Sequence, residues 1–153
     1  MRRQEREIKD RKQIDQIIRR AQICRIGLAD EGGPYVVPVN FGYDGSSLYF
    51  HCAPEGRKLE MIKKDRRVCV EFEVDYQLVA PDGPPCNWTA RYRSVIGFGL
   101  ASLIEGEEEK SAALNAVCEH YGSRPYPFSP RDLARVTMVK INVESLSGKQ
   151  SGY

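Results

Sequence analysis

SLYFHCAPEGRKLEMIKKDRRVCVEF, residues 47–72, is the stretch that decides the fold, because its periodicity changes twice. Its first six residues alternate apolar and polar side chains, which is typical of a half-buried strand. Pro54 and Gly56 interrupt this strand, since proline has no N–H and glycine reaches backbone conformations closed to other residues. Residues 57–64 have the apolar spacing of a short helix, and residues 67–72 return to strand alternation. The stretch therefore predicts a strand, a sharp turn, a helix and a second strand.

The turn before this helix has the composition of an anion site. Backbone N–H groups are unpaired at a helix start and carry roughly half a positive charge, so anions bind there. Gly56 lets a ligand approach the backbone closely, and Arg57 and Lys58 add two cations at a helix end where cations are normally disfavoured. A phosphate would satisfy this arrangement. The structural alternative is a solvated Arg–Lys pair after an ordinary turn.

The rest of the chain is predicted to be rich in antiparallel strands. We expect strands at residues 23–29, 35–43, 88–104 and 136–143, and helices at residues 11–21 and 107–121. Asp44-Gly45 is a strong hairpin signal before the Leu48 strand, whereas residues 77–87 are rich in proline and glycine and predict a loop. Three consecutive strands, a helix and another strand favour an antiparallel β-barrel with helices packed outside, rather than alternating βαβ units.

Composition and charge exclude several classes of function. The 153 residues carry a formal net charge of +2, which argues against nucleic acid as the main partner. The five cysteines are widely spaced without a CxxC pair, so neither a disulfide framework nor a metal site is predicted, and a reducing cytoplasm is expected. No apolar run reaches membrane-spanning length and no signal peptide is recognised, so a membrane is not an expected partner. We expect one domain over residues 1–153, with a basic arm at 1–9 and a loose tail at 147–153.

Pro38 marks an unusual place in the second predicted strand. Proline cannot donate to a strand ladder, so it indicates an edge, a bulge or a backbone diverted towards a ligand. Val39 and Asn40 follow it and could present main-chain groups and a side-chain amide to a flat heterocycle. An edge-strand proline with an exposed Asn40 is the alternative.

Three segments together resemble a known family. They are residues 47–72, GGPYVVPVNFGYDG at residues 32–45, and CNWTARYRSVIGFGLASLIEGEEEKSAALNAVCEHY at residues 86–121. In this order the segments are similar to those of the pyridoxamine 5′-phosphate oxidase-like, FMN-binding split-barrel proteins, within the branch of the nitroimidazole-resistance proteins. The likeness covers residues 8–146. It implies a mainly β, single-domain antiparallel split β-barrel with flanking helices, which forms a homodimer.

The resemblance also implies where a cofactor would bind. The turn at Gly56 would hold the phosphate of FMN, and the Pro38 segment would lie against its isoalloxazine ring. His51 would face the acceptor as a catalytic neighbour, although a lone histidine is more often structural. Cys52 points to the other face of the strand and has the character of a small buried hydrophobe. The implied cofactor-binding positions are Pro38, Val39, Asn40, His51, Cys52, Gly56, Arg57, Lys58, Arg93 and Ser94, the last two from either subunit.

The implied activity is that of an FMN-dependent oxidoreductase. Flavin would accept a hydride from a reduced nicotinamide nucleotide and pass electrons to a small acceptor such as a nitroaromatic. Gly-Phe-Gly at residues 97–99 lacks the third glycine of a dinucleotide fingerprint, so the nucleotide would bind without a Rossmann domain. A flavin- or haem-binding carrier or sensor without efficient turnover is the alternative, with His51 as the candidate haem ligand. A deazaflavin in place of FMN is also compatible with the resemblance.

Overall fold

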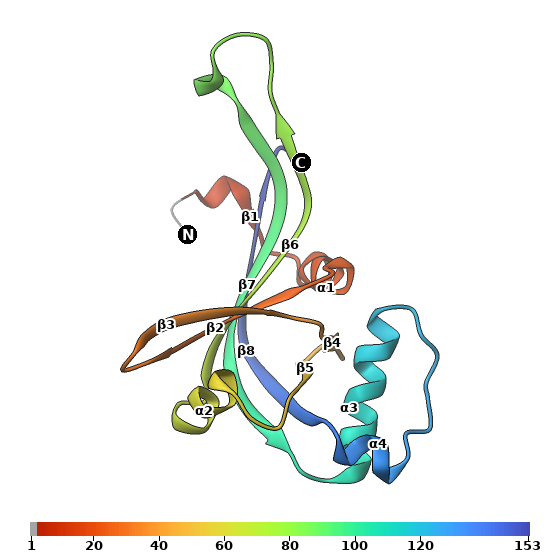
Figure 1. The fold of residues 1–153 in the computed structure, drawn as a ribbon. Helices are drawn as coiled ribbons and strands as arrows, with labels where there is room; N and C mark the ends of the chain where they lie inside the picture. The colour runs from red at the N-terminus through yellow and green to blue at the C-terminus, as the bar shows by residue number, and fades with distance from the viewer. Residues whose placement is uncertain (1–2) are drawn as a thin grey trace.

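One antiparallel sheet of eight strands forms the body of the protein in a computed structural model that describes residues 3–153 (Figure 1). The strands follow the order β3-β2-β6-β7-β8-β5-β4, and β1 pairs with β8. Their bounds are β1 Glu7–Ile8, β2 Cys24–Asp30, β3 Gly33–Val39, β4 Gly42–Tyr43, β5 Ser47–Cys52, β6 Arg67–Val79, β7 Thr89–Ile104 and β8 Thr137–Ser151. The helices are α1 Arg11–Arg20, α2 Arg57–Lys64, α3 Glu107–His120 and α4 Pro130–Ala134, with 3-10 turns at Gln4–Arg6 and Pro85–Asn87. The predicted split β-barrel with flanking helices is confirmed.

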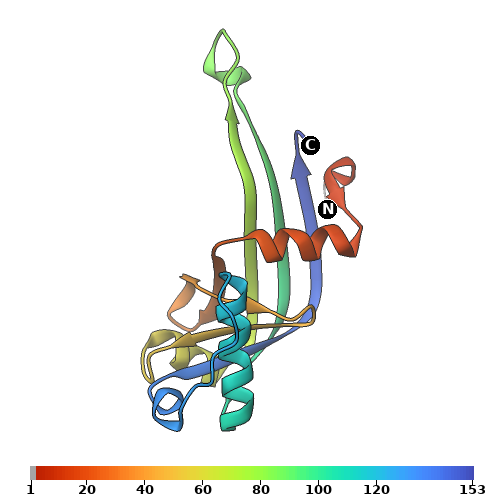
Figure 2. The same cartoon turned by 90° about the vertical axis from the view of Figure 1, so that its right-hand side faces the viewer.

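Alternation along the strands builds the core of the barrel. Leu48 and Phe50 of β5 are buried on one face, while Tyr49 and His51 lie on the other, as the sequence pattern predicts. The apolar stripe of α1 crosses the sheet over β6, β7 and β8 (Figures 1 and 2). Removing this apolar surface from water is the main favourable term in folding. The most deeply buried large side chains include Phe41, Phe50, Phe72, Ile18 and Ile26.

The sheet does not close completely, and its two edges are joined by a short segment. β3 pairs with β2 on one side, and β4 pairs with β5 through residues 42–43 and 48–49. Asn40 and Phe41 connect these two edge strands directly. Residues 50–52 of β5 therefore pair with β8 on one side and have no strand on the other among the residues described. We call the opening between β3 and this free part of β5 the split.

α3 holds the connecting segment in place. The hydroxyl of Tyr121 accepts a hydrogen bond from Phe41 N at 3.2 Å and donates one to Gln22 O at 2.9 Å. The His120 ring packs 4.2 Å from the Phe41 ring, centroid to centroid. Gly42 allows this approach, because a Cβ there would collide with the backbone of Ala116. The end of α3 thus fixes the geometry of the split.

The β6–β7 hairpin extends beyond the barrel as a long arm (Figures 1 and 2). β6 continues to Val79, so the prediction of a loop over residues 77–87 is wrong for its first three residues. Pairing with β7 extends the strand there, with Leu78 opposite Ala90. Trp88 lies near the tip and is 46% exposed, so it does not pack in the core of this subunit.

A cluster around Asp75 ties the base of the arm to the barrel. Asp75 lies at a register shift between β6 and β7 and has a positive φ of 58°. Its carboxylate accepts hydrogen bonds from Arg20 and, at 2.6 Å, from Arg93. The Tyr153 hydroxyl donates to the Asp75 carbonyl at 2.7 Å, and the Tyr153 ring lies 3.9 Å from the Arg93 guanidinium carbon. The first of these contacts, with Arg20, does most to hold the pKa of Asp75 below its usual range.

We expect Asp75→Asn to destabilise the fold by on the order of 1 kcal/mol at neutral pH, with the effect vanishing in acid. Asparagine tolerates the positive φ, so the substitution removes the charge while preserving the backbone. Because the pKa of Asp75 is lowered on folding, its contribution is complete above the unfolded value of about 3.9 and is lost as pH falls through the folded value. Urea unfolding of both proteins from pH 3 to pH 7 measures the difference. Asp82→Asn, in the exposed tip of the arm, is the control, and a pH-independent difference for Asp75 would contradict the ion-pair account.

The predictions for the two ends of the chain need correction. The expected loose tail at 147–153 is wrong for residues 147–151, because β8 runs to Ser151 and pairs with β7 as far as Tyr92. Backbone pairing on both sides holds this end, which the sequence does not reveal because residues 147–151 contain no apolar side chain. In the predicted basic arm, Glu7 and Ile8 form β1, and Ile8 is 4% exposed. Residues 1–2 lie outside the described part. No helix in residues 3–153 is both long and apolar enough to cross a membrane.

Candidate functional site

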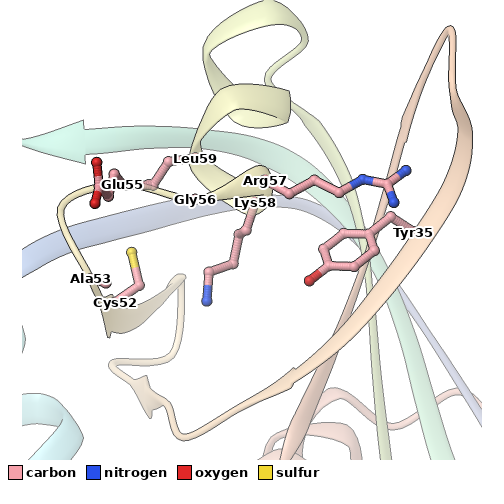
Figure 3. A pocket seen from close by; sticks show the side chains of 8 residues that line it. All are labelled: Tyr35, Cys52, Ala53, Glu55, Gly56, Arg57, Lys58 and Leu59. Atoms are coloured by element: carbon pink, nitrogen blue, oxygen red, sulfur yellow. The ribbon is translucent and has the colours of Figure 1, made fainter.

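A pocket of about 190 Å³ opens where the split meets the start of α2 (Figure 3). β3 contributes one wall, the end of β5 another, and the turn into α2 the third. The lining residues are Tyr35, Cys52, Ala53, Glu55, Gly56, Arg57, Lys58 and Leu59. The structure therefore brings four of the predicted cofactor-binding positions together, namely Cys52, Gly56, Arg57 and Lys58.

The backbone of the turn presents free donors to this pocket. Gly56 has a φ of 131°, which side chains rarely permit, and precedes α2 without a capping side chain. Its carbonyl accepts from Leu59 N at 2.9 Å and from Glu60 N at 3.2 Å. The N–H groups of Arg57 and Lys58 have no hydrogen-bond partner among residues 3–153. Unsatisfied donors at a helix start attract an anion, as the sequence predicts.

The two cations of the turn add to this positive potential. Neither Arg57 nor Lys58 forms a salt bridge within the described residues. The Lys58 ammonium lies 5.2 Å from the centre of the Phe50 ring, and Figure 3 shows the side chain extending into the pocket. Burial raises the pKa of the Cys52 thiol, although the charge of Lys58 acts in the opposite direction. Cys52 is thus a half-buried, neutral residue in the wall of the pocket. This character resembles that of the small buried hydrophobe predicted from its position on the strand.

These features fit a phosphate group. Phosphate brings three strong acceptor oxygens and a charge of about −1.5 to −2. The pocket offers two free backbone donors and two cationic side chains, and open space remains around Gly56. Glu55 is the acidic residue in the lining, so cations outnumber it two to one.

The predicted ring-binding segment lies at the exposed edge of β3. Pro38 is exposed there and lies opposite Arg25 of β2. Because no strand among the described residues pairs with the other edge of β3, the missing N–H of Pro38 costs no hydrogen bond on that side. Asn40 is exposed, whereas the Val39 side chain is buried in the core and can offer a ligand its main chain. A strand rises about 3.3 Å per residue, which places Pro38 about 10 Å along β3 from Tyr35. That separation suits a ligand with a phosphate at one end and a ring at the other.

His51 does not line the phosphate pocket. Its side chain is exposed and lies on the opposite face of β5 from Cys52. Both residues belong to the part of β5 whose outer edge has no strand partner among the described residues. A ligand that fills the split at this edge would have access to both faces, so the predicted role of His51 depends on a ligand reaching beyond the pocket.

Arg93 and Ser94 are also separate from the phosphate pocket within one chain. Arg93 binds Asp75 and borders another cavity, of about 240 Å³, with Arg20, Gln13 and Gln150 among its lining residues. Ser94 pairs with Glu73 on one side and Lys149 on the other. Cofactor contact from these two residues remains a prediction that needs a second subunit.

Sequence reasoning missed Tyr35. This residue lies within a segment quoted for the resemblance, yet nothing in the pattern of β3 separates it from an ordinary half-buried strand residue. The usable signal is its alternation with Val37 and Val39, which places all three on the inner face. Among the described residues no group of three or more histidines, cysteines and acids could hold a metal ion, and the five cysteines are free.

Comparison with known proteins reveals consistent similarity. The family described as pyridoxamine 5′-phosphate oxidase matches residues 10–150. A candidate 5-nitroimidazole antibiotic resistance protein from Bacteroides thetaiotaomicron VPI-5482 superposes with a TM-score of 0.84 at 36% identity, covering 94% of this chain and 86% of that chain. No curated protein matches this sequence.

More distant structures share the fold. The flavocytochrome Anf3 from Azotobacter vinelandii has a TM-score of 0.84 at 20% identity and covers 100% of this chain and 72% of that chain. The FAD and heme binding protein from Mycobacterium smegmatis has a TM-score of 0.84 at 19% identity and covers 97% of this chain and 74% of that chain. At this level of identity the likeness concerns the arrangement of the strands and helices.

Proposed function

Since this chain belongs to the pyridoxamine 5′-phosphate oxidase family, in the branch of the nitroimidazole-resistance proteins, we propose that it is an FMN-dependent oxidoreductase. It takes electrons from a reduced nicotinamide nucleotide and delivers them to a small acceptor such as a nitroaromatic. The bound flavin supplies the electron chemistry, and the protein positions it and adjusts its surroundings.

The observation that carries the proposal is the pocket at the end of the split, whose groups suit a phosphate. Arg57 and Lys58 line it without a salt-bridge partner among residues 3–153, beside two free backbone donors, and positive groups of this kind are stabilised by an anionic partner. Arg57 and Lys58 neutralise the phosphate charge, while Gly56 keeps the approach open. With a cofactor of similar size that lacks a phosphate, the N–H groups and cationic side chains of Arg57 and Lys58 would be hydrated instead of binding the ligand.

In this proposal the ring of the flavin lies along the split, beyond the phosphate pocket. The free edge of β3 at Pro38 and the main chain of Val39 offer groups to one side of a flat heterocycle. Asn40 adds an exposed amide at the point where the chain crosses to β4. Behind them the buried core keeps water from the inner face. In this arrangement His51 faces the acceptor from the outer face of β5 and donates a hydrogen bond to it.

A second copy of the chain completes the site in our proposal. Large apolar side chains are exposed along the arm and on the outer face of β7, and Phe98 is 55% exposed. Several large apolar side chains exposed on one hairpin are typical of a subunit contact. The residues in question are Tyr76, Leu78, Trp88, Ile96 and Phe98. Arg93 and Ser94 lie on the same β7 strand and would reach the partner's cofactor.

Removing the flavin is expected to lower the thermal stability of the dimer and to promote its dissociation. A ligand that binds only the folded dimer stabilises it by about 2.7 kcal/mol at a free concentration of a hundred times Kd. For a chain of this length that corresponds to a shift in melting temperature of several degrees. Sedimentation velocity and thermal melts with and without FMN measure both effects. A monomer that keeps its full complement of flavin would contradict a shared site.

A carrier or sensor that binds flavin or haem is the second candidate. The His51 side chain is exposed and forms no hydrogen bond within residues 3–153, so its ring nitrogens are available to an iron atom. Such a protein would hold its cofactor without efficient turnover.

An absorption spectrum of the purified protein tests both candidates. A flavoprotein is yellow, and bleaching by a reduced nicotinamide nucleotide under anaerobic conditions followed by recovery with a nitroaromatic supports the oxidoreductase. A yellow protein that does not bleach supports the carrier, and a Soret band indicates haem. Mass spectrometry of the released cofactor distinguishes FMN from FAD and from a deazaflavin. A colourless protein that binds none of these would refute the proposal.

A further inference from the structure

Tyr35 and Arg57 are in direct contact across the mouth of the pocket. The guanidinium carbon of Arg57 lies 4.8 Å from the centre of the Tyr35 ring, within the range of a cation–π interaction. Figure 3 shows the Arg57 side chain extending from the start of α2 towards β3, with the ring of Tyr35 beside its guanidinium group. The two residues come from elements on opposite walls of the pocket.

This contact is the one side-chain interaction recorded for Arg57 within residues 3–153, and it holds the guanidinium beside the β2–β3 hairpin, close to Gly32. The side chain is exposed and forms no salt bridge or side-chain hydrogen bond within residues 3–153. A long side chain of this kind loses considerable rotamer freedom when a ligand binds. The half-buried Tyr35 ring is held by β3, so it can restrict Arg57 before the ligand arrives. A guanidinium that is already oriented loses less entropy when it binds an anion.

We propose that Tyr35 is a positioning residue, which orients Arg57 and thereby strengthens its hold on the phosphate of the flavin. The inference rests on the proposed function and deepens it, because it identifies Tyr35 of β3 and Arg57 of α2 as the pair that acts at the phosphate end of the cofactor. The ring of Tyr35, rather than its hydroxyl, carries the effect. Riboflavin, which lacks the phosphate, is insensitive to it.

The test compares FMN with riboflavin on the flavin-free protein, using quenching of flavin fluorescence. Tyr35→Leu removes the aromatic face and is expected to weaken FMN binding about two- to five-fold, the range of an exposed cation–π contact. Riboflavin binding is expected to stay within experimental error. Tyr35→Phe keeps the ring and is expected to bind FMN as the unaltered protein does. Val36→Ala, on the outer face of the same strand, is the matched control.

A double-mutant cycle separates this inference from the proposed function. In an Arg57→Ala background, Tyr35→Leu is expected to cause no further loss of FMN affinity, because the residue through which it acts is gone. Equal losses for FMN and riboflavin, or a loss in Tyr35→Phe as large as in Tyr35→Leu, would overturn the positioning role. If Arg57→Ala weakens FMN binding and Tyr35→Leu does not, the positioning role of Tyr35 is refuted and the phosphate site is retained. If Arg57→Ala leaves FMN binding unchanged, the phosphate site itself is wrong and the role of Tyr35 falls with it.

Discussion

Arg57→Ala is expected to weaken FMN binding about ten- to a hundred-fold, since a hydrogen bond to a charged group contributes about 1.5–3 kcal/mol. The guanidinium forms no salt bridge within residues 3–153, so its removal takes away attraction for the phosphate without leaving a buried charge unpaired, and it uncovers only part of the Tyr35 ring. The fold is expected to survive, because the side chain lies on the surface. Isothermal titration of flavin-free protein with FMN gives the affinity, and the flavin content of purified samples gives an independent check.

Lys64→Ala is the matched control for this prediction. Lys64 is an exposed cation at the other end of α2, so it changes the net charge equally and leaves the phosphate turn intact. Lys58→Ala is expected to behave like Arg57→Ala if the ammonium contacts the phosphate, and to have a smaller effect if it contributes to the field alone. Equal flavin affinity in the Arg57 and Lys64 variants would remove the phosphate assignment.

His51→Gln is expected to slow electron transfer to a nitro or quinone acceptor by on the order of ten-fold or more. A donor aimed at charge that develops on the acceptor contributes more in the transition state than in the ground state. Because His51 is exposed and lies outside the phosphate pocket, the variant is expected to keep its fold and most of its flavin. Reduction of the flavin by the nucleotide is expected to change much less.

Stopped-flow measurement of both half-reactions on the same flavin-normalised sample decides the role of His51. A structural role would appear as a lower melting temperature with normal turnover per bound flavin. An unchanged oxidative half-reaction would end the catalytic interpretation. Tyr49→Phe, two residues earlier on the same face of β5, controls for disturbance of the strand.

The sequence predicts those parts of the structure in which side-chain pattern and backbone chemistry agree. Residues 47–72 were interpretable because alternation, a Pro–Gly break and helical spacing follow each other, and β5, the turn and α2 appear where expected. The same agreement identified Gly56 and the two cations after it. The structure adds that the backbone N–H groups and the charged side chains of Arg57 and Lys58 have no hydrogen-bond or salt-bridge partner within residues 3–153, which no sequence pattern can reveal.

Long-range pairing explains what the sequence did not predict. The strand character of residues 147–151 comes from hydrogen bonds to β7 and β1, and the segment contains no apolar side chain that could give a periodic signal. Tyr35 reaches the pocket because the β2–β3 hairpin folds over the start of α2, a placement that depends on contacts between separate elements. Arg93 is held by Asp75 within its own chain, so a role at a cofactor requires a neighbouring subunit.

The pairing of β5 with β8 also constrains how the protein is made. Ser47 lies opposite Asn142 and Cys52 opposite Thr137, so the strand that leads into the phosphate turn receives its long neighbour last. Ribosomes add about 5–20 residues per second, which leaves β5 waiting for several seconds with its edge exposed to other nascent chains. A chain that stops before Thr137 would contain every residue of the pocket and still lack β8, with which residues 50–52 of β5 pair. We therefore expect flavin to bind only after β8 has been synthesised, and a chain that ends before Thr137 to aggregate instead of folding.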